Sequence, residues 1–482
     1  MTTDGEWSRL SPRMLLVHPV HEVLRQIPVI IGSVVLGSAT GNPMVAFAVV
    51  ALTVSIGIAR WFTTTYRIGP GDLQLRTGIL QRKVLSLPRN RIRSVSTDAR
   101  LLHRLLGLTV LKVSTGQEAK GDDAFALDAV QAEQAPRLRA ILLADSLAPN
   151  VDQAATPGRV LARWQPSWLR YSPLSFTGLA MIAAAVGVAY QVGAGAALRD
   201  SRIEQSSVAV AERFGVAATV AAAAAVVLLA SVMLSVAQSL LSYGNLELRR
   251  DADVLHLKHG LLRVRENTFD TRRLRGGTLR EPLLVRLFGG ARLDAVMTGV
   301  DGAGEASMLL PPCPKSTAGS VLAELIARAD TVYGPLQRHG PAATRRRWTR
   351  ALVIPAVVAV VLVIVAVPVW AWAAWAFLTA CCALLALDRS RSLGHRVGEG
   401  WLVARTGSLQ RRRDCIAAPG IIGWTVRQTL MQRRAGVATL IAATAAGVKH
   451  YRVIDVPADL AWSVAAQASP WVADSKWAAD FG

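Results

Sequence analysis

Long apolar runs alternate along the chain with segments in which polar and apolar residues are mixed. A helix that crosses a bilayer needs about 20 mostly apolar residues. The runs that approach this length lie at residues 27–39, 44–62, 174–192, 214–241, 351–367 and 369–387. Residues 40–43, with Gly, Asn and Pro, favour a tight reversal between the first two runs, and Pro368 separates the last two. The pattern predicts six transmembrane helices in three hairpins, with a first run that is short for a span.

The segments between and after the hairpins carry the alternation that is typical of β-strands. Leu73 and Leu75 alternate with polar neighbours before a turn at Thr77-Gly78, and residues 108–113 are rich in β-branched side chains. Each segment then ends in a stretch with helical character, and these stretches lie roughly at residues 129–147, 316–330 and 457–468. We therefore expect antiparallel strands followed by one C-terminal helix in each segment.

The three segments also share a register of glycines, which indicates an internal repeat. A glycine follows a short strand in each segment, and a second glycine comes 29 positions later. The pairs are Gly78 and Gly107, Gly260 and Gly289, and Gly407 and Gly436. An arginine stands three positions before each second glycine, at Arg104, Arg286 and Arg433. This spacing predicts three copies of one domain.

The predicted fold class is an α+β membrane protein in which three transmembrane hairpins alternate with three β-barrel domains, each capped by a C-terminal helix. The N-terminal segment and first hairpin occupy residues 1–62, and the first domain occupies 63–160. The second hairpin and domain occupy 161–242 and 243–345, and the third hairpin and domain occupy 346–388 and 389–482.

The charge of the chain is strongly basic, with 54 Lys and Arg against 33 Asp and Glu and a net charge of +21. Arginines flank the domain side of the hairpins, whereas residues 40–43 carry no charge and residues 193–213 carry balanced charges. The positive-inside rule then places both termini and all three domains in the cytoplasm. A basic chain suits nucleic acid or an anionic membrane surface, and in a membrane protein we expect lipid and no nucleic acid. The alternative is that the charge serves orientation alone.

The candidate chemistry is sparse. No charged residue lies deep inside any of the six runs, which argues against a proton-coupled transporter. The four cysteines show no metal-ligand spacing, and no hydrolase elbow or phosphate-binding loop is complete. We therefore expect no enzyme activity, no metal and no cofactor.

What remains are three basic clusters, one in each domain. The candidate lipid- or partner-binding residues are Arg82, Lys83, Arg89, Arg91 and Arg93 in the first domain, Arg263, Arg265, Arg272 and Arg273 in the second, and Arg411, Arg412 and Arg413 in the third. Each cluster lies close in sequence to a predicted strand turn. The alternative is a solvated face with no ligand.

The chain resembles the membrane-flanked bacterial pleckstrin-homology (PH) domain family over nearly its whole length, including the alternation of hairpins and domains, and the first domain fits best. The residues that carry the resemblance are Tyr66 with Ile68, Arg76-Thr77-Gly78, Pro88 with Arg91-Ile92, and residues 101–108. The resemblance implies a bent barrel of seven strands closed by a helix, and no enzyme activity. The second domain has Asp270 in place of Pro88, and the third has Ala417 there and Gly420 in place of Arg91.

These observations favour a membrane-anchored scaffold with three cytoplasmic PH-like domains that bind anionic lipid headgroups or a protein partner, such as a sibling PH-domain membrane protein. Usage rich in Ala and Arg suggests the membrane of a bacterial cell. A transporter or channel component, or an accessory subunit of a membrane complex, is the alternative.

Overall fold

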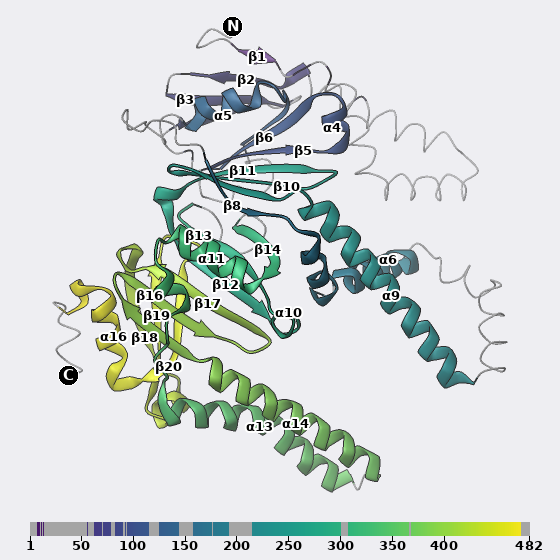
Figure 1. The fold of residues 1–482 in the computed structure, drawn as a ribbon, viewed down its shortest axis with the longest axis vertical. Coiled ribbons are helices and arrows are strands. Elements are labelled where there is room, and N and C mark those ends of the chain that lie inside the picture. Colours follow the sequence, from purple (N-terminus) through teal and green to yellow (C-terminus); the bar gives the residue numbers. More distant parts are fainter. Residues whose placement is uncertain are drawn as a thin grey trace. The chain divides into compact units, whose positions relative to one another are not determined.

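The computed structural model describes residues 7–9, 11, 13, 55, 62–69, 71–78, 82–89, 92, 94–114, 125–143, 158–175, 177–191, 215–299, 307–365 and 368–473 (Figure 1). The chain forms two compact units. Unit 1 comprises residues 1–163 and 241–272, and unit 2 comprises residues 164–240 and 273–482. Each unit is described by itself.

The described residues of unit 1 form two antiparallel sheets, with short helices beside them. In spatial order, the four-stranded sheet consists of β1 (Ser8–Arg9), β2 (Thr65–Ile68), β3 (Asp72–Thr77) and β4 (Lys83–Pro88). The seven-stranded sheet consists of β7 (Phe125–Gln131), β6 (Leu108–Ser114), β5 (Ser94–Ala99), β11 (Val264–Asp270), β10 (Val254–His259), β9 (Glu247–Asp251) and β8 (Arg159–Arg163). The helices are α4 (Leu101–Leu105) and α5 (Ala135–Leu143).

The core of unit 1 joins its two sheets. Leu73 of β3 and Leu111 of β6 are fully buried in one apolar cluster, together with Leu142 of α5. The strict alternation of buried and half-buried residues in the middle of β3 follows from the pleat, because successive side chains point to opposite faces. The strands of the first domain thus enclose a shared core although they belong to separate sheets.

Unit 2 contains the other two sheets. In spatial order, the six-stranded sheet consists of β14 (Met308–Pro314), β13 (Gly290–Met297), β12 (Leu274–Pro282), β17 (Gln410–Ala417), β16 (Trp401–Thr406) and β15 (Gly394–Gly398). The three-stranded sheet consists of β18 (Ile421–Arg427), β19 (Val437–Thr444) and β20 (His450–Pro457). Leu402, Leu440 and Val453 are buried together in the core that joins these sheets.

Short helices decorate the sheets of unit 2. The α-helices are α10 (Leu283–Leu287), α11 (Lys315–Leu325), α12 (Ala329–Tyr333), α15 (Leu430–Arg434) and α16 (Ala461–Ala468). The 3₁₀ turns are η3 (Pro166–Tyr171), η4 (Pro173–Ser175), η6 (Ala418–Gly420), η7 (Ala458–Leu460) and η8 (Pro470–Val472), and η5 (Thr271–Arg273) connects β11 to β12.

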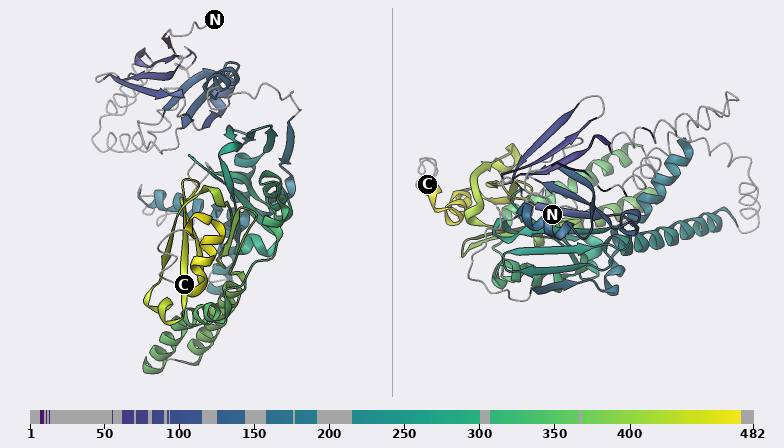
Figure 2. Two further views of the ribbon diagram at one scale, coloured as in Figure 1. Left: turned by 90° about the vertical axis from the view of Figure 1, so that its left-hand side faces the viewer. Right: turned by 90° about the horizontal axis from the view of Figure 1, so that it is seen from above.

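Among the described residues, three helices are long and apolar enough to cross a membrane: α9 (Val216–Tyr243), α13 (Gly340–Val365) and α14 (Val369–Ser392). A fourth candidate is α6 (Thr177–Gln191), whose first part makes a bent pair of 52° with residues 166–175. Helices α13 and α14 run side by side (Figures 1 and 2), and the indole of Trp375 donates to the carbonyl of Pro355 at 2.8 Å. The four later apolar runs are therefore helical. The first two lie almost wholly outside the described residues, and the six-helix count stays a prediction.

The arrangement of the strands differs from the expected set of three separate barrels. The described residues form four sheets and no closed barrel, because β5 of the first domain pairs with β11 of the second and β12 of the second pairs with β17 of the third. A closed barrel has no free edge strand, whereas here edge strands of neighbouring domains pair with each other. A helix does follow the last strand of each domain, as expected, in α5, α11 and α16.

The elements recur in the same order in all three domains. The first glycine of each pair ends a strand with a positive φ, of 120° at Gly78, 104° at Gly260 and 94° at Gly407. The second glycine follows a five-residue helix, and its φ is 67° at Gly107, 73° at Gly289 and 64° at Gly436. Only glycine adopts these conformations at little cost, so the spacing of the glycines sets where each strand turns.

Candidate functional site

The first basic cluster is only partly described. Arg82 and Lys83 are exposed at the start of β4. Arg89 is half-buried and donates to the carbonyl of Ile141 at 2.5 Å. Arg91 and Arg93 lie outside the described residues. Arg82 and Lys83 are thus available to solvent, whereas Arg89 bonds to the backbone of the C-terminal helix.

The second cluster bonds largely to carboxylates within unit 1. Arg263 grips both oxygens of Asp98, and one of these hydrogen bonds measures 2.6 Å. Burial opposes ionisation of Asp98, but the hydrogen bonds and charge of Arg263 outweigh it and hold the pKa of Asp98 below its ordinary value. Arg272 bonds to Asp270 at 3.2 Å, and Arg265 of β11 is half-buried. Arg273, in the turn η5, is also half-buried.

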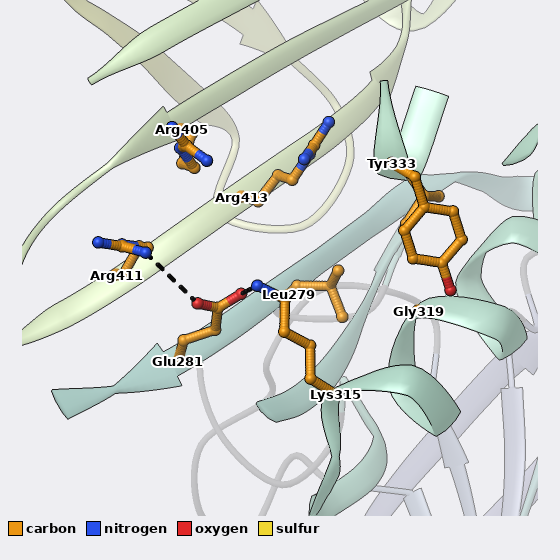
Figure 3. Close-up of a pocket in the computed structure, with 9 residues that line it drawn as sticks. Leu279, Glu281, Lys315, Gly319, Tyr333, Arg405, Arg411 and Arg413 are labelled. Carbon is orange, nitrogen blue, oxygen red and sulfur yellow. Dashed lines mark ion pairs between the residues drawn. The ribbon is translucent and has the colours of Figure 1, made fainter. Parts of the chain in front are cut away.

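The third cluster lies on β17, where it surrounds a small cavity of about 170 Å³ (Figure 3). Arg411 bonds to Asp388 of α14 at 2.6 Å and lies 4.0 Å from Glu281 of β12. Arg413 donates to the carbonyl of Gly334 at 3.0 Å, just beyond α12. Arg412 points elsewhere and bonds to Asp414 at 2.8 Å. Arg411 thus holds α14 to the sheet, and Arg413 holds the end of α12.

The small cavity is crowded with positive charge. Lys315 bonds to the buried Glu281 at 2.8 Å (Figure 3). Arg405, which also lines the cavity, donates to the carbonyl of Ser392 at 2.8 Å. Burial, and then the charges of Arg411 and Arg413, hold the pKa of Arg405 below its ordinary value. The cavity is therefore cationic, but its guanidinium groups already hold helix ends in place.

A larger open cavity, of about 790 Å³, lies between the start of α13 and the short helix α15. Three exposed arginines line it: Arg345 and Arg350 from α13, and Arg434 from α15. Among the described residues these three make no ion pair within 4.0 Å. Val353 and Met431 add apolar surface to the same cavity. Residues 345, 349, 350 and 353 share one face of α13 because helical neighbours recur every three or four positions.

A buried ion-pair network holds together the two helices that line this cavity. Asp455 of β20 is 0% exposed and bonds to Arg346 and Arg347 of α13, the latter at 2.8 Å. Gln432 of α15 donates to the same carboxylate at 2.9 Å. Burial opposes the charge of Asp455, but Gln432 and the two arginines hold its pKa below the ordinary value. One carboxylate of β20 thus connects α13 to α15.

Exposed apolar side chains mark the same short helix in each domain. Leu101 and Leu105 in α4, Leu287 and Phe288 at the end of α10, and Leu430 and Met431 in α15 are between 49% and 74% exposed. Helix α10 is held beside apolar helices, because Arg286 bonds to Asp388 of α14 at 2.9 Å. Tyr171, just before α6, also bonds through its hydroxyl to the carbonyl of Phe288 at 3.4 Å.

The three basic clusters predicted from the sequence do not include the arginines that line the larger cavity. Arg345 and Arg350 directly precede the fifth apolar run, where the positive-inside rule accounts for them as orientation signals. The available signal was the helical spacing of Arg345, Arg346 and Arg350 directly before an apolar run. Arg434 gave no signal, because only the fold brings α15 to α13.

Comparison with known proteins gives one partial match. No curated protein and no solved structure matches the chain significantly. Residues 24–146, which span the end of the N-terminal segment, the first apolar pair and the first domain through α5, match the family model of the bacterial PH domain.

Proposed function

We propose that the chain is a membrane-anchored scaffold whose three PH-like domains lie in the cytoplasm against the inner leaflet and bind anionic lipid headgroups. The match to the bacterial PH domain supports a role in membrane, lipid or protein interaction. The observation that carries the choice of lipid is the arginine-lined cavity at the start of α13.

The chemistry of this cavity suits a phosphate-bearing amphiphile. A guanidinium presents a planar pair of donors that matches two oxygens of a phosphate. Arg350 directly precedes the apolar part of α13, so the cavity lies where headgroups meet hydrocarbon. Each Arg near an anionic leaflet contributes ~1 kcal/mol, which gives about 3 kcal/mol for Arg345, Arg350 and Arg434 together. Val353 and Met431 offer apolar contact to the first part of an acyl chain.

The exposed apolar helix ends support contact with the membrane surface. An exposed leucine by itself is ordinary, but large apolar side chains that recur at one place in three domains indicate an interaction surface. Helices α10 and α15 both lie against segments that begin or end an apolar helix. The lipid interface is therefore the exposed surface around α10 and α15, where the side chains of Phe288 and Met431 can enter the membrane.

The proposal assigns a binding role and no catalytic step. The most buried candidate nucleophiles are unsuited to catalysis, because burial raises the pKa of Cys313 and of Cys415 to about 12. Arg405, Arg411 and Arg413 of the third domain hold helix ends rather than a reacting atom.

The test uses the full chain in a neutral detergent, with native mass spectrometry to count retained lipids. Phosphatidylglycerol or phosphatidylcholine is added at equal concentration. We expect the wild-type chain to retain phosphatidylglycerol preferentially. The variant with Arg345→Gln, Arg350→Gln and Arg434→Gln should lose this preference, because three charges leave the cavity.

The matched control is Arg452→Gln, which removes one exposed arginine of β20 that does not line the cavity. This control should keep the wild-type preference. Equal retention of both lipids by the wild-type chain, or an unchanged preference in the triple variant, refutes the assignment of the cavity to anionic headgroups.

A further inference from the structure

The two places where neighbouring domains meet share one strand register. At the first junction, Val264 of β11, four residues after Gly260, pairs with Ala99 of β5, eight residues before Gly107. At the second junction, Arg411 of β17, four residues after Gly407, pairs with Glu281 of β12, eight residues before Gly289. The same two strands of the domain therefore meet at the same register twice.

Two further strands of the same kinds lie at sheet edges among the described residues. Strand β4, which is the counterpart of β11 and β17, pairs only with β3 among the described residues. Strand β18, which is the counterpart of β5 and β12, pairs only with β19 in the same part of the chain. Each strand therefore presents the edge that its counterparts use at the two junctions.

Exposed edges are costly for a protein to leave open, because their backbone groups are ready to pair with another chain. Val84 on β4 is 50% exposed and Ile422 on β18 is 70% exposed. The two edges are complementary, because the counterparts of β4, which are β11 and β17, pair with the counterparts of β18, which are β5 and β12.

We propose that copies of this chain associate head to tail, with β18 of one copy pairing antiparallel with β4 of the next. The shared register then sets the contacts: Arg82 lies opposite Gln428, and Lys83 lies opposite Arg427 of the other copy. The contact joins two different surfaces, so each added copy leaves the same two edges free. Such contacts build rows that end only when a ring closes. The inference goes beyond lipid binding and does not depend on it.

The test is disulfide trapping between two full-length chains in membrane vesicles. Both carry Cys381→Ser and Cys382→Ser, whereas Cys313 and Cys415 stay because both are fully buried. One chain adds Lys83→Cys and the other, with a different tag, adds Arg427→Cys. Both positions are exposed. Since each chain holds one accessible thiol, any product with both tags joins two copies.

The control keeps everything except the register. It replaces Arg427→Cys by Thr425→Cys, which is also exposed, on the same strand and on the same face. Diagonal neighbours on paired strands lie about 7–8 Å apart, whereas a disulfide needs Cβ atoms about 4 Å apart. We expect at least about fivefold less mixed-tag dimer with Thr425→Cys than with Arg427→Cys. A chain that carries both Lys83→Cys and Arg427→Cys should form a ladder of dimers, trimers and larger products.

A second measurement guards against an oxidation artefact. Lys83 and Arg427 are like charges at opposite positions, so Arg427→Glu should tighten association by about 2- to 5-fold in energy transfer between labelled copies in vesicles. Adding Lys83→Glu should return association to the wild-type level. The proposal is overturned if mixed-tag dimers are absent or equally abundant at positions 427 and 425, or if the charge variants leave energy transfer unchanged.

Discussion

The buried carboxylate of Asp455 offers the sharpest test of how α13 is joined to the third domain. Asp455→Asn removes the negative charge and keeps nearly the same shape. Asp455 has a φ of +59°, and asparagine tolerates this conformation better than other residues with a side chain, so backbone strain stays small. The substitution therefore isolates the charge.

The expected cost follows from what the charge compensates. The side chains of Arg346 and Arg347 are each only 10% exposed. Breaking a buried ion pair by removing one partner costs about 3–5 kcal/mol, because the other charge is left buried and uncompensated. At roughly 2–4 °C per kcal/mol for a unit of this size, the thermal midpoint should fall by several degrees or more.

The assay is thermal unfolding of the full chain in detergent, with hydrogen exchange to locate the change. Exchange should rise in the first turns of α13, in α15 and in β20, which the carboxylate connects. The matched control, Asp459→Asn, removes an exposed carboxylate from η7 and should change the free energy of unfolding by under about 0.5 kcal/mol. If Asp455→Asn melts like this control, then the network does not hold α13 to the third domain.

Three further outcomes are expected. The imidazole of His395 lies 2.8 Å from that of His339, and burial, together with His339, lowers the pKa of His395 to about 4. In the unfolded chain His395 binds a proton below about pH 6.5, whereas in the folded chain it stays neutral until about pH 4. The free energy of unfolding should therefore fall by up to about 3 kcal/mol as the pH drops from 6.5 to 4. Denaturant midpoints at pH 7 and pH 5 check this, and a flat profile contradicts it. Gly178→Val should separate α6 from α9, because a Cβ at Gly178 would lie 1.9 Å from the carbonyl oxygen of Ser231, and a Cys pair across these helices should then cross-link less than in the wild type. Cys415 should react with maleimide only after unfolding, since its pKa of about 12 leaves almost no thiolate; rapid labelling of the folded chain at this position would contradict the buried placement.

The sequence determined the features that depend on local pattern. Helices α9, α13 and α14 lie where the apolar runs at residues 214–241, 351–367 and 369–387 predict them, because a run of this length that crosses a bilayer can satisfy its backbone only as a helix. The glycine pairs marked the turns because a positive φ is cheap only for glycine, and Gly260 and Gly289 have it. The C-terminal helices lie within about six residues of the predicted stretches; α5 begins at Ala135, whereas residue 129, where this helix was expected to begin, belongs to β7.

The tertiary structure decided everything that depends on which edges meet. Strand β5 has the same alternating pattern whether it closes its own barrel or pairs with β11, so the pattern could not distinguish a separate domain from a shared sheet. The arginines show the same limit, because Arg411 and Arg413 belong to a run of three consecutive arginines and yet hold helix ends. Arg434 and Arg350 are 84 residues apart in the sequence and line one cavity. A charge pattern specifies where basic residues are, but only packing specifies which of them are already paired.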